Sequence, residues 1–383
     1  MVLQFDKKIL LVSIVIVIAA VNFWSGSRYP SLEEKAIMGG SARLEDPLSF
    51  EATIQIQPGD GTARRIVLTT INWVETNLQG MMFGLTLGAC LLTLISLIPA
   101  RGHRNGFVNT LIGVGVGTPL GVCVNCAAPV AKGMHDGGAR LETTLATMFS
   151  SPTLNVIVLS MLFSIFPLYL VVIKLTQTLF FILVLVPLLS RWVFRKERLQ
   201  TYGEAVCEIP PVEDNPIKEG PGPSPVNEGW LAAIWGTVIL LAKNLLYIVI
   251  RTVPLMFLAG ALGAIVVHVM PLPSLLEYEA TILSVALIAL VGIFLPVPVA
   301  FDIVLVAVLI SAGAPMIYSM TLLFTLGIFS IYPFFIVWTS ISKRVALVLT
   351  AVLVVIGIIG GYIASDIHQA ELLDMLQYLE QGS

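Results

Sequence analysis

Two cysteines, Cys123 and Cys126, lie three residues apart in the stretch "TPLGVCVNCAAP", which also holds Asn125 and ends at Pro129. Thiols are soft ligands for Zn²⁺, Cu(I) or a trivalent metalloid, and two at this spacing can share one ligand or form a disulfide. A c-type haem site is excluded because Ala127, and not a histidine, follows Cys126. A structural zinc site would need two further ligands, and the chain has no second cysteine pair.

We therefore expect Cys123 and Cys126 to contact a soft or thiol-reactive solute or a metal ion, with Asn125 and Pro129 at the same site. Proline interrupts a helix, and a broken backbone is tolerated at membrane depth only where it lines a cavity or is buried in protein. A half-helix that begins at such a break attracts anions with its free N–H groups. The alternative is that both cysteines are small buried side chains that only pack.

A second polar break, "FSSPTLN", covers residues 149–155 of an otherwise apolar stretch. Ser151 and Asn155 flank Pro152 there. Hydroxyl and amide side chains in such a helix often bond to the backbone of their own helix. The other interpretation is that Ser151, Pro152 and Asn155 line the same site as the cysteines, and both interpretations remain open.

One acidic residue, Asp302, follows "PVPVAF" deep in an apolar run of the second half. Acidic residues within a membrane are costly and usually functional. We expect Asp302 to couple transport to protons or to contact the solute, with a structural partnership to a buried polar group as the alternative. In contrast, we expect Lys132, Arg140 and Glu142 to be loop charges.

The composition indicates a membrane protein. The chain has 383 residues, of which 57% are hydrophobic and only 12% are charged, whereas about a quarter of a soluble domain is charged. Apolar runs of about twenty residues recur without strand-like alternation, which predicts an all-α polytopic membrane protein. The net charge of −3 says nothing about nucleic acid, but there is no basic patch of that kind, so we expect no nucleic-acid partner. Four scattered cysteines do not predict a disulfide scaffold.

Composition shifts along the chain suggest six segments. The stretch "SFEATIQIQPGDGTARRIVLTT" has two alternating runs around a Pro-Gly-Asp-Gly turn, which predicts a small extracytoplasmic β-hairpin. The N-terminal apolar run has the features of an uncleaved anchor more than those of a signal peptide. The predicted segments are a membrane anchor at 1–24, an extracytoplasmic segment at 25–75, a first permease repeat at 76–199, a Pro- and Gly-rich cytoplasmic linker at 200–228, a second repeat at 229–363 and an acidic extracytoplasmic tail at 364–383.

The two halves resemble each other in layout, with Gly138-Ala139 matching Gly313-Ala314. Basic residues mark cytoplasmic loops, here around 101–104, 191–198 and 343–344. Three candidate segments lie between the first two of these loops, so one of them does not cross, and we expect the broken segment 107–136 to be re-entrant. The same reasoning makes 279–314 a re-entrant hairpin from the opposite side. We therefore predict two inverted repeats of transmembrane helices, a layout found in transporters.

At these residues the chain resembles the bacterial predicted-permease family typified by the ArsP organoarsenical efflux proteins. The family pattern is a cysteine-rich break that ends in proline, then a Gly-Ala step, then a "Phe-small-x-Pro-x-x-Asn" break. The matching positions here are Cys123, Cys126 and Pro129, then Gly138-Ala139, then residues 149–155, and the resemblance covers roughly 70–363. The family commonly has Cys-Ser-Cys where this chain has Cys-x-x-Cys. The resemblance implies a permease, proton-driven and exporting, and leaves the solute open.

Together these features predict a multi-pass permease of the cell inner membrane, in which a small solute meets the cysteine pair. One alternative is a transmembrane thiol–disulfide electron carrier, and another is a non-catalytic membrane subunit of a larger complex. The expected partners are a small-molecule or metalloid solute, the lipid bilayer, and either further copies of the chain or complex subunits docked through 25–75. We expect no enzymatic activity and no cofactor.

Overall fold

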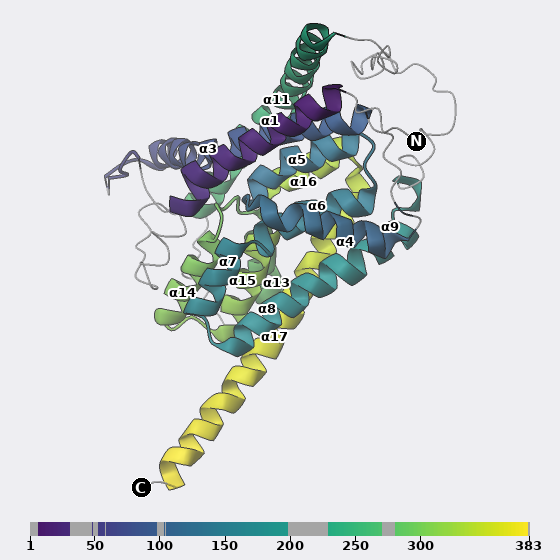
Figure 1. Cartoon of the computed structure of the whole chain (residues 1–383). Helices are drawn as coiled ribbons and strands as arrows, with labels where there is room; N and C mark the ends of the chain where they lie inside the picture. The colour runs from purple at the N-terminus through teal and green to yellow at the C-terminus, as the bar shows by residue number, and fades with distance from the viewer. Residues whose placement is uncertain are drawn as a thin grey trace.

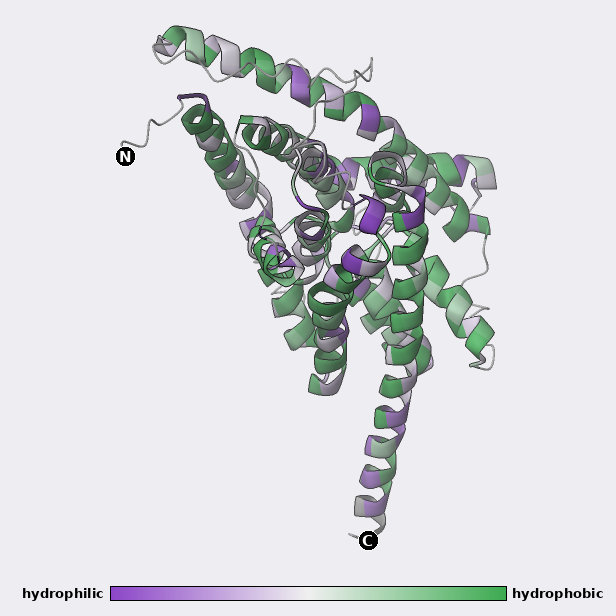
Figure 2. Cartoon of the chain, turned by 90° about the vertical axis from the view of Figure 1, so that its right-hand side faces the viewer, coloured by the Kyte–Doolittle hydropathy of each residue, from purple (hydrophilic) through white to green (hydrophobic). Residues whose placement is uncertain are grey.

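The computed structural model describes residues 7–30, 48, 53–57, 59–97, 103, 105–197, 229–269 and 280–381. Over these residues the chain is helical, with no strand, and most of the helices are hydrophobic (Figure 2). Five helices are long and apolar enough to cross a membrane, or seven if each of two bent helix pairs counts as one span. The predicted linker at 200–228, with Cys207, lies outside the described residues.

Each half of the chain contains long helices and short, broken ones. The first half has α1 (Lys7–Phe23), α3 (Thr62–Leu97), α4 (Gly106–Gly117), α5 (Val124–Asp136), α6 (Leu141–Thr153), α7 (Val156–Ile165), α8 (Leu168–Phe180) and α9 (Val186–Trp192). The second half has α11 (Trp230–Val269), α13 (Ile282–Phe294), α14 (Phe301–Ser311), α15 (Met316–Ile328), α16 (Ile331–Ser340) and α17 (Lys343–Gln381). Figure 1 shows these helices packed into one body, from which the C-terminal part of α17 projects.

The same order of elements occurs in both halves at a constant spacing. Helices α15, α16 and α17 each begin 175 residues after α6, α7 and α8. The preceding turns also match, because Gly138 (φ 91°) and Gly313 (φ 84°) both have the left-handed conformation that glycine adopts without strain. In each turn the alanine N–H bonds to the carbonyl five residues earlier and the glycine N–H to the carbonyl three residues earlier, which is a Schellman cap. This agreement supports the predicted match of Gly138 with Gly313.

Two helical hairpins occupy equivalent positions in the halves, and we call them the first hairpin (106–136) and the second hairpin (282–311). Helix α4 runs parallel to α6, since Thr143 Oγ1 donates to Asn109 O (3.1 Å) and Thr147 Oγ1 to Gly113 O (3.0 Å). Helix α5 runs back toward the start of α6, so the first hairpin begins and ends on one side of the body. Helices α13 and α15 pair in the same way through Tyr318 and Ser284, whose hydroxyls are 2.9 Å apart.

Glycine permits the close packing of α3 on the first hairpin. The sequence of α3 carries Gly80, Gly84 and Gly88 at four-residue intervals, so they lie on one face. A Cβ on Gly84 would collide with the carbonyl of Cys126, and one on Gly133 of α5 would collide with the carbonyl of Gly88. Backbone contact through small residues is the usual means of helix association where lipid removes the hydrophobic driving force.

The predicted β-hairpin is wrong in its second strand. Residues from Thr62 onward belong to α3, which continues without a break to Leu97. Asp60 precedes this helix, accepts the N–H of Gln57 (3.0 Å) and pairs with Arg64 (3.3 Å). One face of this helix packs on α11, where Thr69 Oγ1 lies 2.8 Å from His268 Nε2 and Trp73 is buried against Gly260, whereas Val67 is 56% exposed. Tertiary packing of a long apolar helix therefore outweighs a short alternating pattern.

Two of the segment boundaries drawn from composition fall inside continuous helices. Helix α3 crosses the boundary at residue 75, and α17 crosses the boundary at residue 363. The polar tail therefore begins as the projecting end of α17, where hydrophilic residues are visible in Figure 2. Polar composition alone does not end a helix that lacks a capping signal.

We expect Gly133→Ala to lower the free energy of unfolding by about 1–3 kcal/mol, because its methyl group would press on the backbone of Gly88. Gly115→Ala is the matched control, since nothing lies within 4 Å of a Cβ at that helical position. It should raise the free energy of unfolding by about 0.5–1 kcal/mol through helix propensity. Denaturant unfolding in detergent measures both, and equal effects of the two substitutions would contradict the close α3–α5 contact.

Candidate functional site

The cysteines lie at the tip of the first hairpin. Helix α4 ends in a short 3-10 turn at Thr118–Leu120, and Gly121 (φ 60°) reverses the chain. Cys123 then caps α5, and its Sγ accepts the N–H of Cys126 (3.1 Å). The Cys-x-x-Cys spacing therefore has a local structural cause, because a capping side chain and the residue three positions later meet at the first turn of a helix.

In this structure Cys123 and Cys126 are joined by a disulfide, with their Cα atoms 5.1 Å apart. Both side chains are buried. Asn77 of α3 lies beside them, and its Oδ1 is 3.7 Å from Cys123 Sγ. Its own amide donates to the carbonyl of Trp73 (2.8 Å). The sequence analysis missed Asn77, although an amide on the buried face of an apolar helix is a recognisable signal.

Asn125 connects the two halves of the protein. Its Nδ2 donates to the carbonyl of Val297 (3.1 Å), which is at the tip of the second hairpin. Its Oδ1 accepts from Ser330 Oγ (2.7 Å), at the break between α15 and α16. The buried Asn125 amide therefore bonds to the backbone at the tip of the second hairpin and to a side chain at the break between α15 and α16. The predicted residue Asn125 is at the junction of three broken segments.

The second predicted break is present, and it packs against the first. Helices α6 and α7 meet at an angle of 44°. Asn155 caps α7 by accepting the N–H of Val158 (3.0 Å), and its Nδ2 donates to the carbonyl of Ser151 (2.7 Å). Ser151 Oγ in turn accepts the N–H of Val122 (3.4 Å), next to Cys123.

These contacts place Ser151 beside the cysteine tip, whereas Asn155 bonds within its own broken helix. Pro152 lies in the last turn of α6, inside the same bend, and is buried. Pro129 is within α5, where it cannot donate to the carbonyl four residues earlier. The amide of Asn155 therefore bonds to backbone groups of its own broken helix, whereas the hydroxyl of Ser151 bonds to the backbone of the first hairpin.

Asp302 has a cationic partner that the sequence analysis missed. Lys174 Nζ of α8 lies 2.5 Å from Asp302 Oδ2 of α14, and each side chain is 3% exposed. Asp302 is in the first turn of α14, where the helix dipole favours a carboxylate. A Cβ on Gly327 would collide with this carboxylate, so glycine leaves room for the ion pair. The signal for Lys174 was a lysine within an apolar span.

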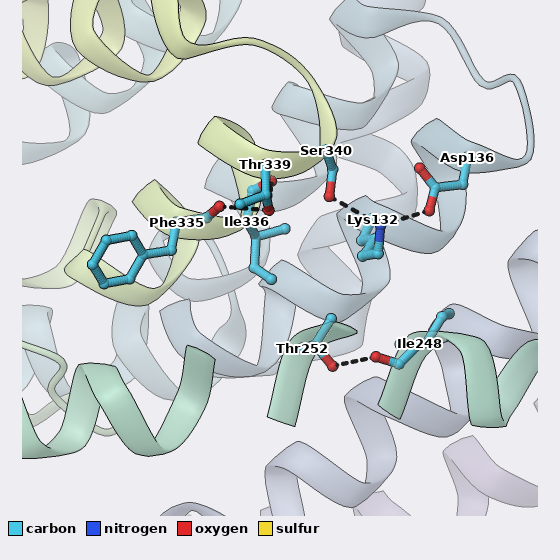
Figure 3. Close-up of polar contacts among 8 residues, drawn as sticks. All are labelled: Lys132, Asp136, Ile248, Thr252, Phe335, Ile336, Thr339 and Ser340. Atoms are coloured by element: carbon cyan, nitrogen blue, oxygen red, sulfur yellow. Dashed lines mark hydrogen bonds and ion pairs between the residues drawn. The ribbon is translucent and has the colours of Figure 1, made fainter. Parts of the chain in front are cut away.

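Lys132 is buried, which corrects the prediction that it is a loop charge. It is 4% exposed and pairs with Asp136 (2.8 Å), and its Nζ also donates to Ser340 Oγ (3.0 Å) at the end of α16. Figure 3 shows the ammonium group between these two oxygens. It also lies 5.2 Å from the ring centroid of Tyr247 on α11, within the range of a cation–π contact. Glu142 is buried too, at 0% exposure.

Lys132 and Lys174, both in the first half, have comparable roles because each connects one hairpin to the other half of the chain. Lys132 joins α5, the second helix of the first hairpin, to α16 of the second half. Lys174 joins α8 of the first half to α14, the second helix of the second hairpin. Across the described residues, no group of three or more His, Cys, Asp or Glu side chains gathers closely enough to hold a metal ion.

We expect Lys174→Met or Asp302→Asn alone to lower the free energy of unfolding by about 3–5 kcal/mol, because each strands a buried polar or charged partner. The double variant Lys174→Met with Asp302→Leu should recover most of that loss. As a control, Arg64→Met breaks the ion pair between Asp60 and Arg64, whose side chain is 72% exposed. It should lower the free energy of unfolding by no more than about 1 kcal/mol. Denaturant titration in detergent provides the comparison, and single variants as stable as wild type would rule out a buried pair.

Comparison with known proteins supports a membrane permease. A family model described as a predicted permease, of the ArsP type, matches residues 74–365. The chain is also similar to the UPF0718 protein YraQ of Escherichia coli (strain K12). The two are 27% identical over 289 residues, which cover 74% of this chain and 76% of the relative. No solved structure gives a significant match.

The matched region begins within α3 and ends within α17, so it contains both hairpins, both broken helix pairs and the two buried ion pairs. Helix α1 and the first part of α3 lie before it. With apolar helices long enough to span a membrane and a family match over most of its length, this chain belongs to the ArsP family of predicted permeases.

Proposed function

We propose that the protein is a secondary transporter of the cell inner membrane that exports a small, soft or thiol-reactive solute. Cys123 and Cys126, in their reduced form, would be its ligands, and Asn125, Ser151 and Asn155 would provide the polar lining. The observation that carries the proposal is the pair of hydrogen bonds from Asn125 to Val297 O and from Ser330 to Asn125. They bring the breaks of both halves together directly beside the thiols, as expected for a transporter site between repeats.

The directions of the helices support inverted repeats. Helix α5 runs parallel to α16, because Asn125 contacts Ser330 near the start of both and Lys132 contacts Ser340 near the end of both. The pair α15–α16 therefore ends on the side where the first hairpin begins and ends. The pair α6–α7 starts on that side and runs the other way. Hairpins that enter from opposite sides and touch at their tips would be re-entrant segments in a membrane.

The distribution of charge supports a cytoplasmic location for the ends of the first hairpin. On that side Ser342 donates to Glu197 (3.0 Å), which brings the start of α17 next to the residues after α9. The basic residues Arg191, Arg195, Lys196, Lys343 and Arg344 belong to these two segments. At the other side Tyr169 contacts His368 (3.2 Å), beyond which α17 carries Glu371 and Asp374. The positive-inside rule then places the acidic end of α17 outside.

The buried pair of Lys174 and Asp302 is the natural site for energy coupling. It joins the returning helix of the second hairpin to α8, beside the bend at Gly327. Protonation of Asp302 would remove one charge of the pair and release that hairpin helix, whereas deprotonation would hold it in place. A proton gradient would thereby bias which hairpin is free to move. The charge pair at Lys132 would stabilise the opposite hairpin.

Cysteine substitutions at equivalent turns test the inverted topology. We expect Gly138→Cys to be labelled by a membrane-impermeant maleimide only from the cytoplasm and Gly313→Cys only from the periplasm, in a background without the native cysteines. The two sites are matched, because both have positive φ and nothing lies within 4 Å of an added Cβ. Labelling of both from the same side would contradict the proposal.

Replacing the thiols tests the binding role. We expect Cys123→Ser with Cys126→Ser to abolish export of phenylarsine oxide, a neutral trivalent arsenical, from loaded right-side-out vesicles. The fold should be retained, since serine can still cap α5. Cys90→Ser, which removes a third buried thiol of α3, is the control and should transport normally. Unchanged export by the double variant would refute a thiol role for this solute.

A thiol–disulfide electron carrier is the second candidate, and the disulfide itself favours it. Cys123 caps a helix, and Cys-x-x-Cys at a helix N-terminus is the arrangement of dithiol oxidoreductases. Such a carrier would pass electrons by exchange with a partner dithiol, one disulfide being reduced as the other forms. The single variant Cys126→Ser would then accumulate as a mixed disulfide with a partner protein, which a transporter would not do.

A further inference from the structure

The N-terminal helix brings a buried arginine to the cysteine site. After α1 the chain continues through a π-helical turn, Trp24–Arg28. Phe23 stacks on Phe83 of α3, with ring centroids 4.1 Å apart, and Trp24 packs against Gly121 at the hairpin tip. Gln79 Nε2 also donates to the carbonyl of Gly26 (3.3 Å). These contacts fix the end of α1 against the first hairpin and α3.

Arg28 is 5% exposed. Among the residues that the structure describes, it has no ion pair or hydrogen bond, and its Nε is buried without a partner. Its guanidinium carbon is 4.5 Å from the ring centroid of Phe23. This cation–π contact offsets only part of the cost of removing a full charge from water. A buried arginine with so little compensation is suited to bind an anion.

The guanidinium group of Arg28 and the sulfur of Cys126 both lie next to Gly80 of α3. A Cβ added to Gly80 would lie 2.6 Å from Cys126 Sγ and 3.9 Å from Arg28 Nη2. A side chain at this position would therefore collide with Cys126 Sγ and also reach the arginine. Asn77, one turn earlier on α3, contacts Cys123. A positive charge, two sulfur atoms and an amide therefore lie close together within a largely apolar surrounding.

We propose that Arg28 binds the anionic group of the solute while Cys123 and Cys126 contact its soft centre. This rests on the proposed function and specifies the substrate class, a small soft solute that carries an oxyanion such as a carboxylate. The planar guanidinium fork matches the two oxygens of such a group better than a lysine does. Helix α1 precedes the residues that the family model matches, so Arg28 lies outside the matched region.

A pair of alkylating reagents that differ in charge tests the proposal without any transport. The full-length protein in detergent is reduced with dithiothreitol, desalted, and treated with iodoacetate or iodoacetamide. The measured quantity is the ratio of the two alkylation rates at Cys123 and Cys126, followed by mass spectrometry. We expect Arg28→Gln to lower the iodoacetate-to-iodoacetamide ratio about tenfold, and Arg28→Lys to lower it less. The same ratio in wild type and Arg28→Gln would overturn the proposal.

Lys7→Gln is the matched control, because it removes the same charge from the far end of the same helical segment, where Lys7 lies 5.2 Å from the ring centroid of Trp230. Its ratio should equal that of wild type. Without added anion, Arg28→Gln should be at least as thermally stable as wild type, because an uncompensated buried charge is removed. A clear loss of stability would show that Arg28 serves the fold and would also overturn the proposal.

Thermal unfolding also tests whether Arg28 binds an anion, and it does so even if neither alkylating reagent reaches the thiols. Inorganic phosphate, compared with chloride at equal ionic strength, should raise the melting temperature of wild type and Lys7→Gln but not that of Arg28→Gln. No rise in wild type, or an equal rise in all three, would count against the anion site. Neither readout depends on transport, so a failed export assay with a charge-dependent alkylation ratio would reject the proposed function and retain the anion site.

Discussion

The need to satisfy a broken backbone inside an apolar body governs this structure. Each hairpin tip and each bent helix frees N–H and C=O groups that hydrocarbon cannot bond. The Asn125 side chain meets part of this need by donating to Val297 O and accepting from Ser330 Oγ. Because these groups belong to the second half of the chain, the interruptions are stable only when the halves are assembled. The site is therefore formed by both halves together.

Packing and charge reinforce that assembly. Glycines on α3 allow its backbone to touch α5, which leaves little room for the first hairpin to shift. The buried lysines then join each returning hairpin helix to the opposite half, Lys132 through Ser340 and Lys174 through Asp302. A buried ion pair adds little net stability compared with apolar packing, but separating its partners is strongly destabilising. Such a pair therefore favours the one arrangement of helices in which both partners meet. A protein that must exchange between arrangements can use such pairs as points of control.

Much of the site could be predicted because its residues break local rules. Cysteines, prolines and an asparagine in an apolar helix identify the first hairpin tip, and "FSSPTLN" identifies the bend between α6 and α7. Prediction failed where the local pattern was ambiguous. The alternating residues after Thr62 resemble a strand, but burial of Trp73 against α11 favours the helix. Lys132 resembled a loop charge because nothing in the sequence reveals that Asp136 and Ser340 surround it.

The sequence by itself determined the class of protein, the positions of the helix breaks and the spacing of the cysteines, because composition and proline act locally. Only the tertiary structure decided which charges are paired, since the partners of Asp302 and Lys132 lie far away in the chain. It also placed Arg28, 95 residues before Cys123 in the sequence, beside the cysteine pair. The physical reason is that burial determines the free energy of a charged group, and burial depends on how helices distant in the sequence pack together.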